Sequence, residues 1–206
     1  MADGDAEYSW RTTSLFLRPL QAGDRDEFLR IHEISHASFQ RWLPERPAGE
    51  TADERFEEVL HRTRVGLAEG TEVRLVGFTS DGRMAGVFAL SQIFRRAFMN
   101  AYAGWFVSSD QTGKGLATEG VGALLDLAYA PEPRGLGLHR VQANINPINR
   151  ASVRVAEKNG FRREGEAKGY LYIGGAWQDH LMFAKLAEEH GPVDGPVDGP
   201  VDGPED

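Results

Sequence analysis

Hydrophobic residues recur at helical spacing in four segments of the chain. The first helix is predicted after residues 24–27, and the second after residues 51–54, because both tetrapeptides resemble a capping box. Two further helices are predicted over residues 115–128 and 149–159. Gly160 follows the last of these and suits the left-handed residue that commonly ends a helix.

Short runs rich in branched and aromatic residues predict strands between these helices. The seven predicted strands cover residues 15–19, 72–78, 84–94, 101–107, 140–144, 161–172 and 177–185. Gly174 and Gly175 predict a tight hairpin turn between the last two, and a loop holding Trp42 is predicted after the first helix. Strands interleaved with helices predict one α/β (mixed α+β) domain over residues 13–190.

The two ends of the chain lack these patterns. Residues 1–12 are expected to be flexible, and residues 191–206 repeat Gly-Pro-Val-Asp, a composition with little to bury. We expect this tail to be disordered, with docking onto a partner as the alternative. Five of the net −8 charges lie in the tail, so residues 1–190 carry about −3.

Composition excludes several classes of function. The 206 residues, 41% hydrophobic and 26% charged, suit one globular domain, and no apolar run reaches the roughly 20 residues of a membrane span. Cysteine is absent, which excludes disulfides, thiolate metal sites and a cysteine nucleophile and fits a cytoplasmic protein. The acidic charge argues against nucleic acid and would suit a cationic substrate. Six scattered histidines suggest no metal site.

The most informative segment is residues 110–119, Asp-Gln-Thr-Gly-Lys-Gly-Leu-Ala-Thr-Glu, where a strand passes through a glycine turn into a helix. Unpaired N–H groups and the positive end of the dipole at such a helix start can bind a phosphate or pyrophosphate. The alternative is that Gly113 and Gly115 only form a tight turn. A Walker loop is excluded because Lys114 precedes Gly115, and a dinucleotide fingerprint because Thr118 replaces its third glycine.

A second segment, residues 144–152 (Asn-Ile-Asn-Pro-Ile-Asn-Arg-Ala-Ser), joins a strand to a helix. Asn149 is placed to cap this helix, and Ser152 lies three residues further on. Both residues could serve the helix alone, or they could contact a ligand.

Together these segments resemble the GNAT superfamily of N-acetyltransferases and, within it, the RimJ/RimL branch that acetylates protein N-termini. The resemblance covers roughly residues 15–186. It depends on Leu-Arg-Pro-Leu at residues 17–20, the glycine loop at 113–119, the Asn-x-x-Pro-x-Asn-x-x-Ser pattern at 144–161, and Tyr-Ile-x-Gly-x-Trp-x-Asp-His at 172–180.

The resemblance implies a mostly antiparallel, twisted central sheet of about seven strands, splayed between the fourth and fifth and flanked by about four helices. Acetyl-CoA would lie in that opening, and no metal would be needed. The implied cofactor-binding residues are Phe106, Val107 and Ser108 for the pantetheine arm, Thr112, Gly113, Lys114, Gly115, Leu116, Ala117 and Thr118 around the pyrophosphate, and Asn144, Asn149 and Ser152. The chain departs from the superfamily pattern at Asp110, where Gln or Arg is frequent.

The expected reaction is direct attack of a neutral amine on the thioester in a ternary complex. Ser152 is the candidate donor to the departing sulfur. Leu171 stands where some RimL-type enzymes carry a glutamate base, so Glu33, with its neighbour His32, and His180 beside Asp179 are the candidate bases.

The expected acceptor is the N-terminal α-amine of a protein or peptide. Its pKa of about 7.7–8.0 leaves more of it neutral than a lysine side chain near 10.4. A small-molecule amine (antibiotic, polyamine or amino acid) and a non-catalytic acyl-CoA-binding module are the alternatives. The residues Trp42, Leu43 and Pro44 could line the acceptor pocket or pack as core. The sequence leaves a monomer and a homodimer equally open.

Overall fold

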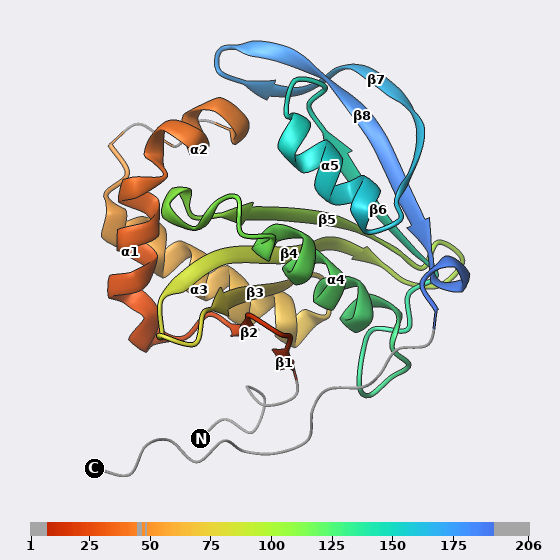
Figure 1. Cartoon of the computed structure of the whole chain (residues 1–206), viewed down its shortest axis with the longest axis horizontal. Helices are drawn as coiled ribbons and strands as arrows, with labels where there is room; N and C mark the ends of the chain where they lie inside the picture. The colour runs from red at the N-terminus through yellow and green to blue at the C-terminus, as the bar shows by residue number, and fades with distance from the viewer. Residues whose placement is uncertain (1–7, 45–46, 48, 192–206) are drawn as a thin grey trace.

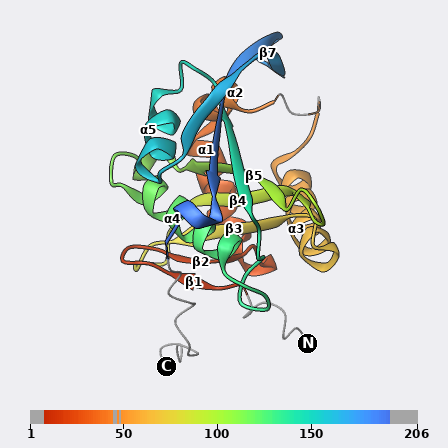
Figure 2. The same cartoon turned by 90° about the vertical axis from the view of Figure 1, so that its right-hand side faces the viewer.

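The computed structural model describes residues 8–44, 47 and 49–191. Residues 1–7 of the expected flexible N-terminus, and the repeat tail beyond Gly191, lie outside the described residues. One sheet runs through the molecule, with α4 and α5 on one face and α1 and α3 on the other (Figures 1 and 2). No helix in the described ranges is long and apolar enough to cross a membrane.

The described residues form a sheet in the order β1-β2-β3-β4-β5-β6-β8-β7. Its eight strands are β1 (Trp10–Arg11), β2 (Phe16–Pro19), β3 (Val73–Phe78), β4 (Met84–Phe94), β5 (Asn100–Val107), β6 (Arg140–Ile145), β7 (Arg162–Ile173) and β8 (Ala176–Leu186). All neighbouring pairs are antiparallel except β5 and β6, which are parallel. The prediction of a mixed, mostly antiparallel sheet is confirmed.

Five α-helices lie within the described ranges. They are α1 (Arg25–Ile34), α2 (His36–Trp42), α3 (Ala52–Glu69), α4 (Leu116–Tyr129) and α5 (Arg150–Lys158). The described residues also contain three short 3₁₀ segments: η1 (Ala22–Asp24) before α1, η2 (Ser109–Gln111) after β5, and η3 (Ala187–Glu189) after β8. Gly160 ends α5 in the left-handed conformation, with φ of 76°, as the sequence predicted.

Two elements differ from the sequence prediction. The segment expected to be a loop around Trp42 contains helix α2, whose only buried hydrophobic residue is Phe39. Residues 10 and 11, expected to be flexible, form strand β1, and Trp10 is 3% exposed. Both elements are too short for a hydrophobic period to be visible, so contacts with the rest of the fold decide their conformation.

The first of the two expected capping boxes is wrong. Asp24 precedes α1, but its carboxylate accepts two hydrogen bonds of 2.7 Å from Arg18 and one of 2.8 Å from the backbone N of Gln21. A bidentate, charge-assisted pair is stronger than a helix cap and draws the carboxylate away. The second box forms as predicted, since Glu54 N donates to Thr51 Oγ1 at 3.2 Å and Thr51 N donates to Glu54 at 2.8 Å.

The core divides into two parts, one on each face of the sheet. The larger part joins α4 and α5 to the sheet through residues such as Phe88, Leu124 and Phe183. The smaller part lies under α1 and α3 and includes Phe28 and Phe56. Because each face is covered by its own helices, the sheet holds the segments that follow β5 and β6 in fixed positions.

Candidate active site

The sheet opens between β5 and β6, as predicted. The two strands pair only at their first residues, Asn100 with Arg140, Ala101 with Val141 and Tyr102 with Gln142. Beyond Tyr102 they diverge, and β5 keeps its other neighbour, β4, as far as Val107. Figure 1 shows α4 beside β5 and α5 beside β6 on the two sides of this divergence. Residues 103–107 therefore present one edge of backbone groups that no strand pairs.

Only part of that edge can bind an extended ligand. Ser108 N donates to Ala85 O at 2.7 Å, and the carbonyl of Phe106 approaches Gly86 so closely that a Cβ there would lie 2.4 Å from it. Both residues thus direct their backbone groups toward β4. Because backbone groups alternate along an antiparallel strand, Val107 directs its own toward the opening. Of the three residues predicted for the pantetheine arm, Val107 is the one whose N–H and C=O point toward the opening.

The glycine loop lies at the end of this edge and is open. Gly113 and Gly115 have φ of 79° and 83°, and a Cβ at either position would meet nothing within 4 Å. Residues 112–115 are exposed. Within the described residues, no hydrogen bond is made by the backbone N–H groups of residues 112–117. Such N–H groups at the positive end of α4 fit a pyrophosphate.

Side chains around the loop are held by each other. Lys114 Nζ donates to Gln111 Oε1 at 2.7 Å, which lays the lysine along the loop. Asp110 accepts from Ser108 Oγ at 2.6 Å and pairs with Arg30 at 3.0 Å and Arg83 at 3.1 Å. The unusual Asp110 is therefore structural, because it ties the approach to the loop to α1 and to the β3–β4 turn.

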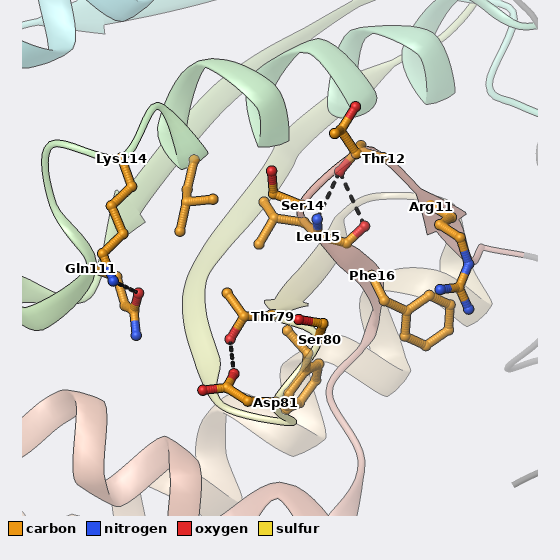
Figure 3. A pocket seen from close by; sticks show the side chains of 13 residues that line it. Arg11, Thr12, Ser14, Leu15, Phe16, Thr79, Ser80, Asp81, Gln111 and Lys114 are labelled. Carbon is orange, nitrogen blue, oxygen red and sulfur yellow. Dashed lines mark hydrogen bonds between the residues drawn. The ribbon is translucent and has the colours of Figure 1, made fainter.

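A hollow of about 600 Å³ lies on the other side of the loop. Hydroxyl groups of Thr12, Ser14 and Thr79 line it, together with Asp81, and Lys114 borders it (Figure 3). It lies beside the turns of β1–β2 and β3–β4, away from the opening between β5 and β6. It therefore adjoins the pyrophosphate loop without reaching the place where a thioester would lie.

Asn149 and Ser152 lie at the start of α5, on the β6 side of the opening. Asn149 caps the helix, since its Oδ1 accepts from Ser152 N at 3.2 Å. Capping uses the amide oxygen and leaves Nδ2 to donate to a ligand carbonyl. Ser152 is partly exposed. The expected cap is confirmed, and the ligand roles of both residues stay predictions.

Asn144 belongs to the opposite face of the sheet. Its Oδ1 accepts from Gln142 Nε2 at 3.0 Å, and its Nδ2 donates to the Tyr170 hydroxyl at 2.6 Å. Burial, and to a smaller extent Tyr102, raises the pKa of Tyr170, so its phenol stays protonated. This polar chain was missed from the sequence, because a bulge in β7 brings Tyr170 to a residue 26 positions away. The cofactor-binding role expected for Asn144 stays a prediction.

His180 lies on the same face and is 3% exposed. Its ring lies 5.4 Å from that of Tyr170, and its Nδ1 is 3.1 Å from Gln178 O. With the Nδ1 proton assigned to that carbonyl, Nε2 is the nitrogen that can accept a hydrogen bond. The expected relay with Asp179 is not formed, because adjacent strand residues face opposite ways and Asp179 instead pairs with Lys168 at 2.8 Å.

The other candidate bases differ in their surroundings. Glu33 is exposed in the last turn of α1. His32 is buried, and its ring lies 4.1 Å from Phe28 and 4.8 Å from Phe39. Among the described residues, no three His, Asp or Glu side chains are grouped so as to hold a metal ion.

A second, smaller pocket of about 260 Å³ lies on this face. It extends from Gly104, Trp105 and Phe106 of β5 to α1 and α3. Leu43 lines it, while Trp42 is half-buried beneath the guanidinium of Arg41 and Pro44 is exposed. Of the three residues expected to line an acceptor pocket or the core, only Leu43 lines this pocket.

Comparisons with known proteins agree with this geometry. The Acetyltransferase (GNAT) domain model matches residues 14–162. The chain is 34% identical over 179 residues to the "Probable N-acetyltransferase YjcK" of Bacillus subtilis, covering 84% of this chain and 94% of that protein. It is also 34% identical over 107 residues to the "[Ribosomal protein uS5]-alanine N-acetyltransferase" of Escherichia coli, covering 52% and 53%.

A solved structure, "Mycobacterium smegmatis RimJ in complex with CoA-disulfide", superposes with a TM-score of 0.78 at 29% identity, covering 87% of this chain and 85% of that one. That neighbour binds CoA, and the open edge and open loop described above fit the same cofactor. The chain therefore belongs to the GNAT family of acetyl-CoA-dependent N-acetyltransferases, and its relatives include the RimJ/RimL type.

Proposed function

We propose that this enzyme acetylates the N-terminal α-amine of a protein or peptide. The observation that carries the proposal is a buried histidine, His180, on the sheet face opposite α5, whose Nδ1 lies 3.1 Å from Gln178 O. With the proton on Nδ1, its Nε2 can accept another, and a pocket that borders β5 lies on the same face of the sheet. The similarity to an alanine N-acetyltransferase for ribosomal protein uS5 supports it. An acceptor of that kind would place the reaction in the cytoplasm.

The residues around the opening have distinct binding roles in this proposal. Acetyl-CoA supplies the acetyl group activated as a thioester. The N–H groups of residues 112–117 would bind its diphosphate, and Val107 would pair with its pantetheine arm. Asn149 Nδ2 would donate to a pantetheine carbonyl from the β6 side. Both sides of the opening thus orient the thioester toward the acceptor face.

The chemistry requires one bond to form and one to break. The amine nitrogen bonds to the thioester carbonyl carbon, the carbon–sulfur bond breaks, and CoA leaves as a thiolate. We assign His180 Nε2 as the acceptor of the proton that the amine loses. Ser152 Oγ–H would donate a hydrogen bond to the departing sulfur and stabilise its charge. An α-amine, with a pKa of about 7.7–8.0, needs no stronger base than an imidazole.

A small-molecule amine is the second candidate acceptor, because the pocket beside β5 is large enough to receive one. An acceptor panel separates the two. CoA thiol release is measured with an Ala-initiated peptide, the same peptide with a blocked N-terminus and an internal lysine, a polyamine and free amino acids. Mass spectrometry then locates the acetyl group. We expect the free α-amine peptide to be the best acceptor, and turnover only with the polyamine would overturn the proposal.

The base assignment is tested by two matched variants. His180→Gln should lower kcat by about a hundredfold at pH 7, and raising the pH should recover part of it because more of the amine is then neutral. Glu33→Gln should leave kcat and its pH profile unchanged, since Glu33 is exposed. The affinity for acetyl-CoA, measured by calorimetry, should be unchanged in both. The reverse pattern would assign the base to Glu33.

A further inference from the structure

The pocket beside β5 has a cationic wall. Arg55 and Arg62 of α3 and Arg74 of β3 line it, and its remaining wall is mostly apolar, with Leu20, Val76 and Val87 among the lining residues. Three arginines around one small pocket are unexpected in a chain with a formal net charge of −8. The pocket is therefore positively charged and favours an anionic group on a substrate. The acidic composition of the whole chain, by contrast, favours a cationic substrate.

The arginines are only partly neutralised by their neighbours. Arg62 and Arg74 share one carboxylate, Glu72, with the Arg62 contact at 3.1 Å. Arg55 pairs with Glu50 at 3.3 Å. Arg62 also lies 3.8 Å from the half-exposed Glu58, a contact that solvent screens. Apart from Glu58, two carboxylates therefore pair with the three guanidinium groups, and neither of these carboxylates lines the pocket.

Two of these side chains also carry a buried donor without an acceptor. The Nε atoms of Arg55 and Arg74 are shielded from solvent and make no hydrogen bond within the described part of the chain. A buried N–H without a partner costs free energy, so these arginines are held at the pocket under some strain. Both belong to residues that line the pocket, and their side chains are 21% and 20% exposed. Solvent does not reach the two Nε atoms, so a ligand would bind the accessible part of each guanidinium group.

The position of the pocket relates these donors to the reaction. Its opposite wall is formed by Gly104, Trp105 and Phe106 of β5, the strand whose edge borders the opening. Gly104 has no side chain, and a Cβ there would meet nothing within 4 Å, so the pocket stays open at this strand. A molecule that occupies the pocket from β5 to α3 would have one end near the thioester and the other among the arginines.

We propose that this pocket selects acceptors that carry a carboxylate at a short distance from the reacting amine, an inference that rests on the proposed function. The carboxylate would accept hydrogen bonds from Arg55 and Arg74 and pair with Arg62, while the apolar lining would contact the chain between the two groups. The same chemistry is found in a peptide with an acidic residue soon after its N-terminus and in a small amino acid. A polyamine would be repelled by the three guanidinium groups.

The test compares acceptors that differ only in the carboxylate. Rates of CoA release are measured for Ala-Asp and Ala-Asn peptides, for Ala-Glu and Ala-Gln peptides, and for a free amino acid and its amide. We expect kcat/KM to be about tenfold higher for each carboxylate acceptor than for the matching amide. A charge-assisted hydrogen bond in a partly exposed pocket contributes roughly this factor. Comparing the peptides with the free amino acid shows which of these two classes of acceptor the enzyme uses.

Substitutions of the pocket arginines test whether these residues cause the preference for a carboxylate. Arg55→Gln with Arg62→Gln should remove the preference by raising KM for carboxylate acceptors, with amide acceptors little affected. Arg64→Gln is the matched control, because Arg64 is an exposed arginine of α3 and does not line the pocket. Acetyl-CoA binding by calorimetry confirms that each variant is folded.

Equal kcat/KM for carboxylate and amide acceptors, or a preference that survives the double substitution, would overturn this inference while leaving α-amine acetylation intact. If no peptide is acetylated although acetyl-CoA binds, the proposed function itself fails. The two failures are therefore distinguishable.

Discussion

At the scale of single residues, Asp110 shows how one carboxylate fixes the approach to the glycine loop. Burial alone would raise its pKa, but the hydrogen bond from Ser108 and the charges of Arg30 and Arg83 outweigh burial and lower it below the usual 3.8. The ionised form is thus favoured by folding. The ionised Asp110 carboxylate therefore stabilises the fold at pH values above its unfolded-state pKa. This stabilisation is lost as the pH falls through the lower folded-state pKa.

Asp110→Asn should therefore reduce the free energy of unfolding by about 1 kcal/mol at pH 7, a modest value because the side chain is partly exposed. The difference from the unsubstituted protein should begin to shrink below about pH 4, where the carboxylate of the unfolded chain becomes protonated, and should vanish once the folded protein is protonated too. Urea denaturation at pH 7 and pH 3 measures both. Asp26→Asn is the control, since Asp26 is 96% exposed beside Arg25 and should change little. An equal loss at both pH values would contradict the electrostatic explanation.

Gly113 tests the pyrophosphate loop itself. Gly113→Glu should weaken acetyl-CoA binding at least about a hundredfold, because the new carboxylate repels the diphosphate and covers the N–H groups that would bind it. Gly82→Glu is a matched control, since Gly82 has φ of 77°, close to the 79° of Gly113, and equally open surroundings. Both variants bear the same backbone strain, so calorimetry isolates the effect of position. Unchanged affinity in Gly113→Glu would place the diphosphate elsewhere.

Residue roles were predictable from the sequence where they depend on near neighbours. The cap by Asn149 follows from a spacing of three residues and is confirmed. Asp24 looked like a cap for the same reason, but Arg18 on β2 takes its carboxylate. The contact of Asn144 with Tyr170 spans 26 positions and depends on a bulge, so no local pattern could predict it.

At the scale of elements, α4 is the helix that carries the loop, and a glycine sets how closely it packs. A Cβ on Gly120 would lie 2.2 Å from the ring of Phe88 on β4, which is fully buried. The helix therefore approaches the sheet as closely as a glycine permits. This close approach fixes where the start of α4, and with it the loop, lies relative to β5.

Two substitutions in α4 should consequently have opposite signs. Gly120→Ala should destabilise the protein by about 1–3 kcal/mol, because the methyl group forces α4 away from Phe88. Gly122→Ala should stabilise it by up to about 1 kcal/mol, since alanine favours a helix and its Cβ would meet only Asn159 Oδ1 at an ordinary 3.5 Å. Chemical denaturation compares the two. A stabilising Gly120→Ala would show that the packing is looser than described.

Elements long enough to show a repeating hydrophobic pattern were predicted well, and short elements were not. Helix α3 has 18 residues, and its capping box and the hydrophobic stripe that follows the box were visible in the sequence. Helix α2, with 7 residues, and strand β1, with 2, carry too few hydrophobic positions to define a period. Their conformations follow from packing against the rest of the domain.

At the scale of the whole molecule, the opening between β5 and β6 was expected only through the family resemblance. Hydrophobic patterns identify strands but not which of them are neighbours, and pairing limited to three residues has no local signal. The opening divides the binding groups between two parts of the fold. Val107 and the glycine loop belong to the β5–α4 side, and Asn149 and Ser152 to the β6–α5 side.

Hydrogen exchange of single amides, measured by NMR, can test this division. Acetyl-CoA should slow exchange at residues 112–117, because their N–H groups become bonded, and also at Val107, whose N–H faces the opening. Ser108 should change little, since its N–H is already bonded to Ala85. ADP at saturating concentration, which has the diphosphate but no pantetheine arm, should protect residues 112–117 alone. If acetyl-CoA protected the β1–β2 turn instead, the cofactor would occupy the larger hollow beside the loop, and the thioester could not reach the face that holds His180.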